Sequence, residues 1–181
     1  ALPSKEALAQ TLKLIDYRQI SLDIQRISLN IPGMQLTLNG IAQGYITDRV
    51  TELLREAGMQ KVLVDMGEVR GLDLLQNTDP WKVGIRSPKD DNALLTRVDL
   101  RNEAIATSAG SGTPLDEEGT VHHLFNPKTG YSPKLYQSVS VMAKDATTAD
   151  ALSTTFSLMP IEQIKRIQEQ IPETKVYLFL P

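Results

Sequence analysis

The segment TADALST, which begins at Thr148, contains a carboxylate and hydroxyl groups that could bind a metal ion. Asp150 is followed at spacings of three and four by Ser153 and Thr154. Residues at these spacings share one face of a helix, so their oxygen atoms are expected to converge. A carboxylate with hydroxyls suits Mg²⁺, whose remaining positions are filled by water and substrate phosphates. The alternative is that Thr147 caps this helix and Asp150 stabilises its first turn without any metal.

The second such segment holds the two histidines of the chain, His122 and His123, followed by FNPKTG. On a strand their rings face opposite sides, so we expect one ring in a cleft and the other in solvent. A neutral imidazole near pH 7 is a suitable general base for a hydroxyl group. The alternatives are a surface strand or a transition-metal site, but no cysteine or third histidine supports zinc.

Two further segments offer backbone groups to a ligand. In LTLNGIAQGYITD (36–48), Gly40 lies at an expected strand-to-helix junction, where its carbonyl stays available. AIATSAGSGT (104–113) ends a strand in small residues and hydroxyls, whose N–H groups suit an anion. The ordinary interpretations are a glycine-containing helix start and a flexible turn. A serine hydrolase is disfavoured because no nucleophile elbow surrounds the serines of the second segment.

Hydrophobic periodicity predicts the elements that must position these segments. Helices are expected at 4–15 with Ser4 as cap, at 41–57 with Gly58 as left-handed cap, at 147–159 and at 161–170. Strands are expected at 19–23, 26–30, 61–66, 81–88, 96–100, 103–107, 138–143 and from 175. The order lacks a regular crossover, which predicts an α+β fold with mixed or antiparallel sheets and packed helices.

Composition excludes several classes of protein. The 181 residues carry a formal charge of −3, with a pI near 5.4, so a general binder of nucleic-acid phosphates is not expected. No cysteine is present, which rules out disulfides and thiolate chemistry but fits either cytoplasm or periplasm. No apolar run approaches the roughly 20 residues that span a bilayer.

Four segments together resemble the ApbE family of FAD:protein FMN transferases: LTLNGIAQGYITD, VDMGEVRG, HHLFNPKTG and TADALST. The first two resemble its NosX branch, which is associated with nitrous oxide respiration. The resemblance implies an ApbE-like (T-fold-like) core, with residues 1–181 as a single domain lacking the N-terminal part of the family. The start at Ala1 without Met and the end at Pro181 are expected of a processed or trimmed piece.

The resemblance also implies a role for each matching position. The metal, Mg²⁺, is implied at the following residues: Gly40, Asp150, Ser153 and Thr154. His123 is implied as the general base. Flavin contacts are implied at these positions: Thr37, Gln43, Thr107, Ser108 and Phe125. Family members commonly carry an acidic residue, a Lys and a second Asp where this chain has Thr37, Gln43 and Ser153, so neutralising the pyrophosphate depends more heavily on Mg²⁺.

The implied reaction is the Mg²⁺-dependent transfer of FMN from FAD to a Ser or Thr hydroxyl of a target flavoprotein, with release of AMP. The implied partner is a membrane-bound regulator of nitrous oxide reduction, and the implied location is the periplasm. The alternatives are a non-catalytic FAD-binding or maturation partner, suggested by Thr37 and Gln43, and an inactive remnant. Arg70 is expected to pair with a surface carboxylate rather than with a phosphate.

Overall fold

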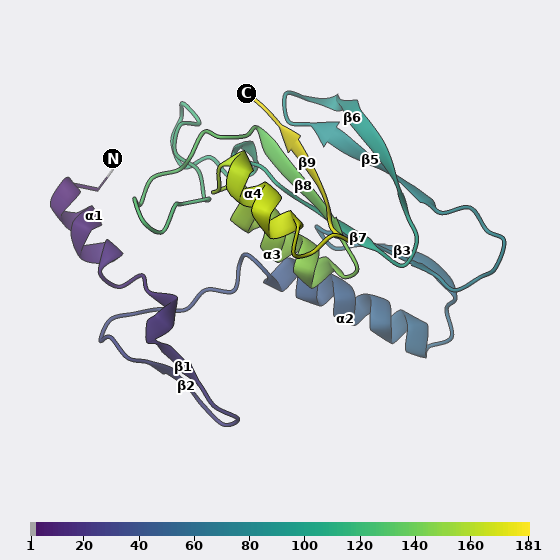
Figure 1. Ribbon diagram of the computed structural model, residues 1–181, viewed down its shortest axis with the longest axis horizontal. Helices are drawn as coiled ribbons and strands as arrows, with labels where there is room; N and C mark the ends of the chain where they lie inside the picture. Colours follow the sequence, from purple (N-terminus) through teal and green to yellow (C-terminus); the bar gives the residue numbers. More distant parts are fainter. Residues whose placement is uncertain (1–2) are drawn as a thin grey trace.

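The computed structural model describes residues 3–181, which are built around a five-stranded antiparallel sheet (Figure 1). Its strand order is β3-β4-β7-β8-β9, with these bounds: β3 (Lys61–Asp65), β4 (Val69–Asp73), β7 (Ala104–Ser108), β8 (Ser138–Ala143) and β9 (Lys175–Phe179). Every residue of β8 is buried, so this strand lies in the centre of the core. The α+β prediction with antiparallel pairing is confirmed.

Three helices cover one face of this sheet (Figure 1): α2 (Ala42–Glu56), α3 (Ala146–Phe156) and α4 (Ile161–Gln168). Val139 and Val141 point from β8 to this face, where they pack against Phe156 and Ile164. At the end of α2 the chain turns at Gly58, whose φ is +88°. The Gly58 cap is confirmed, because its N–H and the next one bond back to the last helical turn, at 3.0 Å each.

A β-hairpin covers the opposite face of the sheet. It consists of β5 (Trp81–Ser87) and β6 (Asp90–Leu100). Its Ile85, Val98 and Leu100 form a buried cluster with Ile105 and Met142 of the sheet. Successive residues of a strand point to opposite faces, so neighbouring positions of β8 serve two different cores. The sheet is therefore a rigid central layer between the helices and the hairpin.

The N-terminal residues form an arm beside this body (Figure 1). It contains α1 (Lys5–Leu12), the 3-10 turn η1 (Tyr17–Gln19) and the short pair β1 (Ile20–Leu22) and β2 (Ile27–Leu29). Ser4 caps α1 as predicted, with its Oγ accepting from the Ala7 N–H at 3.2 Å. No residue of α1 is buried, which confirms a surface helix.

Several elements differ from the predictions. Strand β4 was not predicted, since its Gly71 breaks the strand pattern. A Cβ there would lie 3.1 Å from the Trp81 ring, so the glycine lets the hairpin approach. The predicted strand 96–100 is the end of the eleven-residue β6. Helix α3 ends at Phe156, three residues early. The two histidines lie in a loop rather than on a strand, with one isolated bridge at His122.

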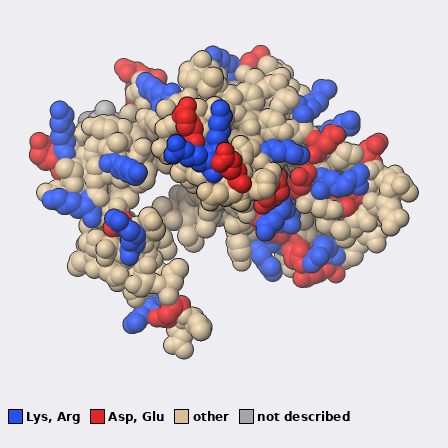
Figure 2. All heavy atoms as spheres, in the orientation of Figure 1, with Lys and Arg blue, Asp and Glu red and all other residues tan. Residues whose placement is uncertain are grey.

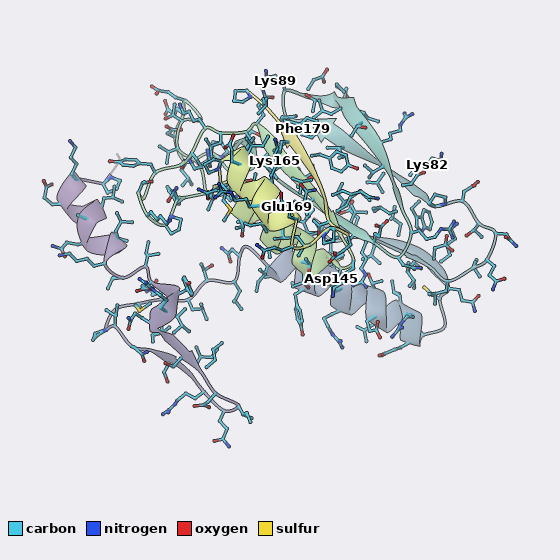
Figure 3. All side chains as sticks on the ribbon, in the orientation of Figure 1. Lys82, Lys89, Asp145, Lys165, Glu169 and Phe179 are labelled. Carbon is cyan, nitrogen blue, oxygen red and sulfur yellow. The ribbon has the colours of Figure 1, made fainter. Side chains whose placement is uncertain are left out.

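The charged side chains on the face shown in Figure 2 are mixed, with Lys and Arg next to Asp and Glu. Figure 3 shows the same mixture as sticks, with Lys165 and Glu169 both on or next to α4. No helix among residues 3–181 is long and apolar enough to cross a membrane.

Candidate active site

Nine of the ten predicted site residues line one cleft of about 500 Å³. They come from four separate parts of the chain: Thr37, Gly40, Gln43, Thr107, Ser108, His123, Phe125, Asp150 and Thr154. The tenth, Ser153, lies behind the wall of the cleft and has no exposed surface. Segments that are more than a hundred residues apart therefore meet at one place, as the resemblance implied.

The helical wall of the cleft carries Asp150 and Thr154 from α3. The convergence was predicted for the oxygens of Asp150, Ser153 and Thr154. The structure brings two of these hydroxyls to Ser108, whose Oγ lies 2.8 Å from Ser153 Oγ and 3.2 Å from Thr154 Oγ1. Ser153 also donates to the carbonyl oxygen of Asp150, at 3.1 Å. The Ser153 hydroxyl thus joins the strand β7 to the helix α3 from inside the core.

The capping alternative for Asp150 is wrong. The cap of α3 is Asp145, whose carboxylate accepts from the Thr148 N–H at 2.7 Å, so Asp150 lies beyond the first turn. Its Oδ2 instead accepts from the N–H of Gly44, on the other helix, at 3.0 Å. Only 4% of Asp150 is exposed, and this burial raises the pKa of its carboxyl, whereas the Gly44 bond lowers it.

The second wall is the start of α2 together with the residues just before it. Gln43 lies in the first turn of α2, and Gly40 precedes the helix. Gly40 lies against Thr154, since a Cβ at Gly40 would be 3.4 Å from the Thr154 Cγ2. The amide of Gln43 lies against Gly67, where a Cβ would be 2.7 Å from its Nε2. Gly67 has a φ of +103°, a conformation that favours glycine. The two glycines therefore let the helix start and the β3–β4 turn close around the cleft.

The positions for which the resemblance implied flavin contacts also line the cleft. Thr107 is the last residue but one of β7, and its Oγ1 lies 2.7 Å from the Oγ of Ser140 in β8. After β7 the chain makes the 3-10 turn η2 (Gly110–Gly112), as expected for a turn of small residues. Phe125 is 43% exposed at the cleft, which leaves its ring free to stack on a planar ligand.

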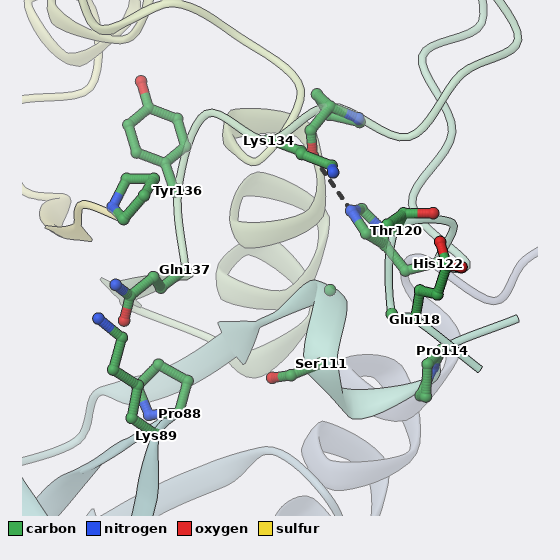
Figure 4. A pocket seen from close by; sticks show the side chains of 14 residues that line it. Pro88, Lys89, Ser111, Pro114, Glu118, Thr120, His122, Lys134, Tyr136 and Gln137 are labelled. Carbon is green, nitrogen blue, oxygen red and sulfur yellow. Dashed lines mark hydrogen bonds between the residues drawn. The ribbon is translucent and has the colours of Figure 1, made fainter. Parts of the chain in front are cut away.

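The two histidines face different sides of one loop, but the prediction that the second ring lies in solvent is wrong, because His122 is buried. His123 lines the cleft, whereas His122 is buried and lines a second cavity of about 600 Å³ (Figure 4). Both ring nitrogens of His122 are used: Nε2 lies 3.1 Å from the Pro133 carbonyl oxygen, and Nδ1 accepts from the Leu124 N–H at 3.3 Å. His122 therefore stabilises the loop, and His123 is the imidazole that faces a ligand.

Glu68 is the functional candidate that the sequence reasoning left out. It lines the cleft, is 7% exposed, and lies close enough to Asp150 to feel its charge. Burial is the main cause that raises the pKa of Glu68 to about 8, and the charge of Asp150 is the second. A hydrogen bond from the Thr107 backbone acts in the opposite direction and lowers this pKa. The available signal was its place directly after Gly67, the glycine of the turn in VDMGEVRG.

Arg70 forms an ion pair with Asp48, a mostly buried carboxylate of α2. The expectation that Arg70 pairs with a carboxylate rather than a phosphate is confirmed, although that carboxylate is only 15% exposed. Among the described residues that line the cleft, none is Lys or Arg. The cleft therefore presents two carboxyl groups, those of Asp150 and Glu68, to a ligand, and no ammonium or guanidinium group among its described lining residues.

The donor set fits Mg²⁺. Among the side chains that the structure describes, no group of three or more His, Cys, Asp or Glu is placed to hold a metal. A cation at Asp150 must therefore also use neutral oxygens, such as Thr154 Oγ1 and the Gly40 carbonyl, together with water or ligand oxygens. This mixture of hard ligands is the one that Mg²⁺ takes, and a cation would relieve the repulsion between Asp150 and Glu68.

The fold and the cleft define an α+β domain with an oxygen-lined ligand site at the junction of two helix starts and a sheet. The chain belongs to the ApbE family, whose model matches residues 1–178. An FAD:protein FMN transferase of Treponema pallidum is 29% identical over 203 aligned positions, covering all of this chain and 55% of the relative. One of Klebsiella pneumoniae is 27% identical over 168 positions, covering 90% and 52%.

Solved structures agree with this assignment. The ApbE protein of Thermotoga maritima superimposes with a TM-score of 0.88 at 28% identity, covering 98% of this chain and 59% of the other. The fold is also that of the Pseudomonas stutzeri flavinyl transferase ApbE, with a TM-score of 0.82 at 24% identity, covering 100% and 57%. The chain thus spans between half and three fifths of the length of these relatives.

Proposed function

We propose that this chain is the larger, C-terminal part of an enzyme that transfers FMN from FAD to a Ser or Thr hydroxyl of a target flavoprotein. The observation that carries the proposal is the single cleft lined by nine of the ten predicted positions. In the reaction the acceptor oxygen bonds to the phosphorus of the FMN half, and the pyrophosphate bond breaks to release AMP. His123, which faces the cleft, takes the proton of the acceptor hydroxyl.

The charge of the cleft supports a requirement for Mg²⁺. A pyrophosphate is anionic, and the cleft offers it Asp150 and Glu68 but neither Lys nor Arg. Asp150, Thr154 and the Gly40 carbonyl would hold Mg²⁺, which supplies positive charge to the pyrophosphate oxygens. Gln43, in place of the usual Lys, contributes only a hydrogen bond from its amide. Mg²⁺ would therefore supply the positive charge that the usual Lys provides at the position of Gln43.

The decisive experiment is the intact mass of a candidate acceptor domain after incubation with this chain, FAD and Mg²⁺, with an EDTA control. A mass gain equal to FMN, lost with EDTA, supports the transferase. Asp150→Asn is a sharper test of the metal site than Asp150→Ala, because the amide oxygen still accepts from the Gly44 N–H. Transfer at the wild-type rate in Asp150→Asn would remove Asp150 from the metal site.

The role of His123 is tested with a matched pair of variants. His123→Ala is expected to bind FAD normally and to transfer FMN at least about a hundredfold more slowly. His122→Ala, on the other side of the same loop, changes the loop without touching the cleft directly. Unchanged transfer in His123→Ala would eliminate it as the base.

A non-catalytic FAD-binding partner is the second candidate, and the absence of Lys and Arg from the cleft lining favours it. Stoichiometric FAD binding without release of AMP would select this function. We further propose a periplasmic location and, as acceptor, a membrane-bound regulator of nitrous oxide reduction. Both rest on the similarity of residues 36–48 and 64–71 to the NosX branch. Cell fractionation, and flavinylation of that acceptor, would test them.

A further inference from the structure

Asp48 lies on α2, one turn after Gly44, and does not line the cleft. Its carboxylate accepts three hydrogen bonds from the start of α3: from the Ala146 N–H and the Thr147 N–H, each at 2.8 Å, and from the Thr147 Oγ1 at 2.5 Å. It also pairs with Arg70 of β4. Burial alone would raise the pKa of Asp48, but these hydrogen bonds outweigh it and hold the pKa below its ordinary value.

Asp150 of α3 makes the corresponding contact with the start of α2. The first N–H groups of a helix have no partner within that helix, and they carry its partial positive charge. Helix α2 receives no side-chain cap from its own cap residue, Ile41. Its Gly44 N–H donates instead to Asp150, from α3, at 3.0 Å. Each of the two helices thus receives at its start a carboxylate from the other helix.

This reciprocal pair of carboxylates, Asp48 and Asp150, holds two helix starts in direct contact. A Cβ at Gly44 would lie 2.3 Å from the carbonyl oxygen of Ala146, so the helices have no room to approach further. The α2 start and the residues just before it carry Gln43 and Gly40, and α3 carries Asp150 and Thr154. The pair therefore sets the separation of the two opposite walls of the cleft.

We propose that Asp48 is a positioning residue for the Mg²⁺ and FAD site, acting through α3 on Asp150 rather than by touching a ligand. The inference rests on the proposed function, because it assigns Asp48 to that reaction. Asp145 provides the contrast, since it caps the same helix through the Thr148 N–H at 2.7 Å (Figure 3 labels it). Asp145 belongs to the chain segment that leads into α3, so its loss weakens the helix start without releasing α2.

The test compares Asp48→Asn with Asp145→Asn in two measurements on the full chain. The first is Mg²⁺ binding by calorimetry, and the second is hydrogen exchange of the Gly44 amide by NMR without metal. Asp48→Asn is expected to weaken Mg²⁺ binding by about tenfold, as loss of a supporting contact to a metal site does. It should also speed Gly44 exchange by about tenfold, whereas Asp145→Asn changes both less than about twofold.

Equal effects of the two variants would overturn the proposal, since Asp48 would then act only as a helix cap. No change in either measurement for Asp48→Asn would overturn it as well. If Asp48→Asn does not fold, Thr147→Val removes one of the three bonds and should give a smaller effect of the same kind, roughly two- to fivefold. Failure of the wild type to bind Mg²⁺ would contradict the proposed function, while Gly44 exchange would still decide whether Asp48 controls the contact.

Discussion

The buried carboxyl of Glu68 gives a quantitative prediction about stability and pH. Burial and the neighbouring charge of Asp150 raise the pKa of Glu68 from an ordinary 4.5 to about 8. Between these two values the folded protein keeps a proton on Glu68 that the unfolded chain has lost. The free energy of unfolding therefore falls as the pH rises from about 4.5 to about 8, and this loss is complete above pH 8.

The size of this effect follows from the pKa difference. Each pH unit between the two pKa values lowers the free energy of unfolding by about 1.4 kcal/mol, so the largest possible loss is near 5 kcal/mol. Water can enter the open cleft and screen the carboxylate. We therefore expect ionisation of Glu68 to lower the free energy of unfolding by about 2 to 3 kcal/mol. For a chain of this length, that free energy corresponds to a difference of roughly 5 to 10 °C in Tm.

The assay is thermal and urea unfolding of wild type and Glu68→Gln at several pH values from 5 to 9, in EDTA. Gln keeps the shape and the acceptor oxygen of Glu68 but cannot ionise. The two proteins should be equally stable at pH 5, and the variant should be the more stable one at pH 9. Glu169→Gln, at an exposed position after α4, is the control and should show no such divergence. A stability difference for Glu68→Gln that stays constant with pH would refute the reasoning.

Three other predictions concern the site and its supports. Gly44→Ala should lower the free energy of unfolding by at least about 2 kcal/mol in urea melts, whereas Gly112→Ala, where a Cβ meets open space, should change it little. His122→Ala should cost about 2 kcal/mol because it leaves partners of both ring nitrogens unpaired, while His123→Ala should leave Tm nearly unchanged. Saturating Mg²⁺ should raise the Tm of wild type and fail to raise that of Asp150→Asn.

Local patterns in the sequence predicted most of the helices and strands, but they could not predict which distant segments meet at the cleft. Asp150 and Thr154 are a turn apart, and helical spacing alone places them on one face. Their meeting with Gly40 and His123 was implied only by family resemblance, because no periodic pattern encodes contacts between distant segments. The same limit explains β4, whose Gly71 is required by the packing of Trp81 and not by the strand itself.

Asp48 and Glu68 show why local patterns miss such residues. From the sequence, Asp48 is one of many polar positions on an amphipathic helix, and nothing nearby reveals that it bonds to residues 146 and 147. Glu68 follows a glycine turn, where an exposed carboxylate is the ordinary expectation, yet the tertiary fold buries it beside Asp150.

The cleft buries the carboxyls of Asp150 and Glu68, and its described lining holds neither Lys nor Arg. This is unfavourable in the absence of a cation, because burial raises the pKa of both carboxyls and the charge of Asp150 raises that of Glu68 further. Mg²⁺ bound at Asp150 would offset the negative charge of Asp150, so the metal should lower the pKa of Glu68. The folded state then no longer keeps the extra proton. The pH dependence of stability predicted above in EDTA should therefore flatten in saturating Mg²⁺, and it should do so less in Asp150→Asn, whose metal site lacks its carboxylate.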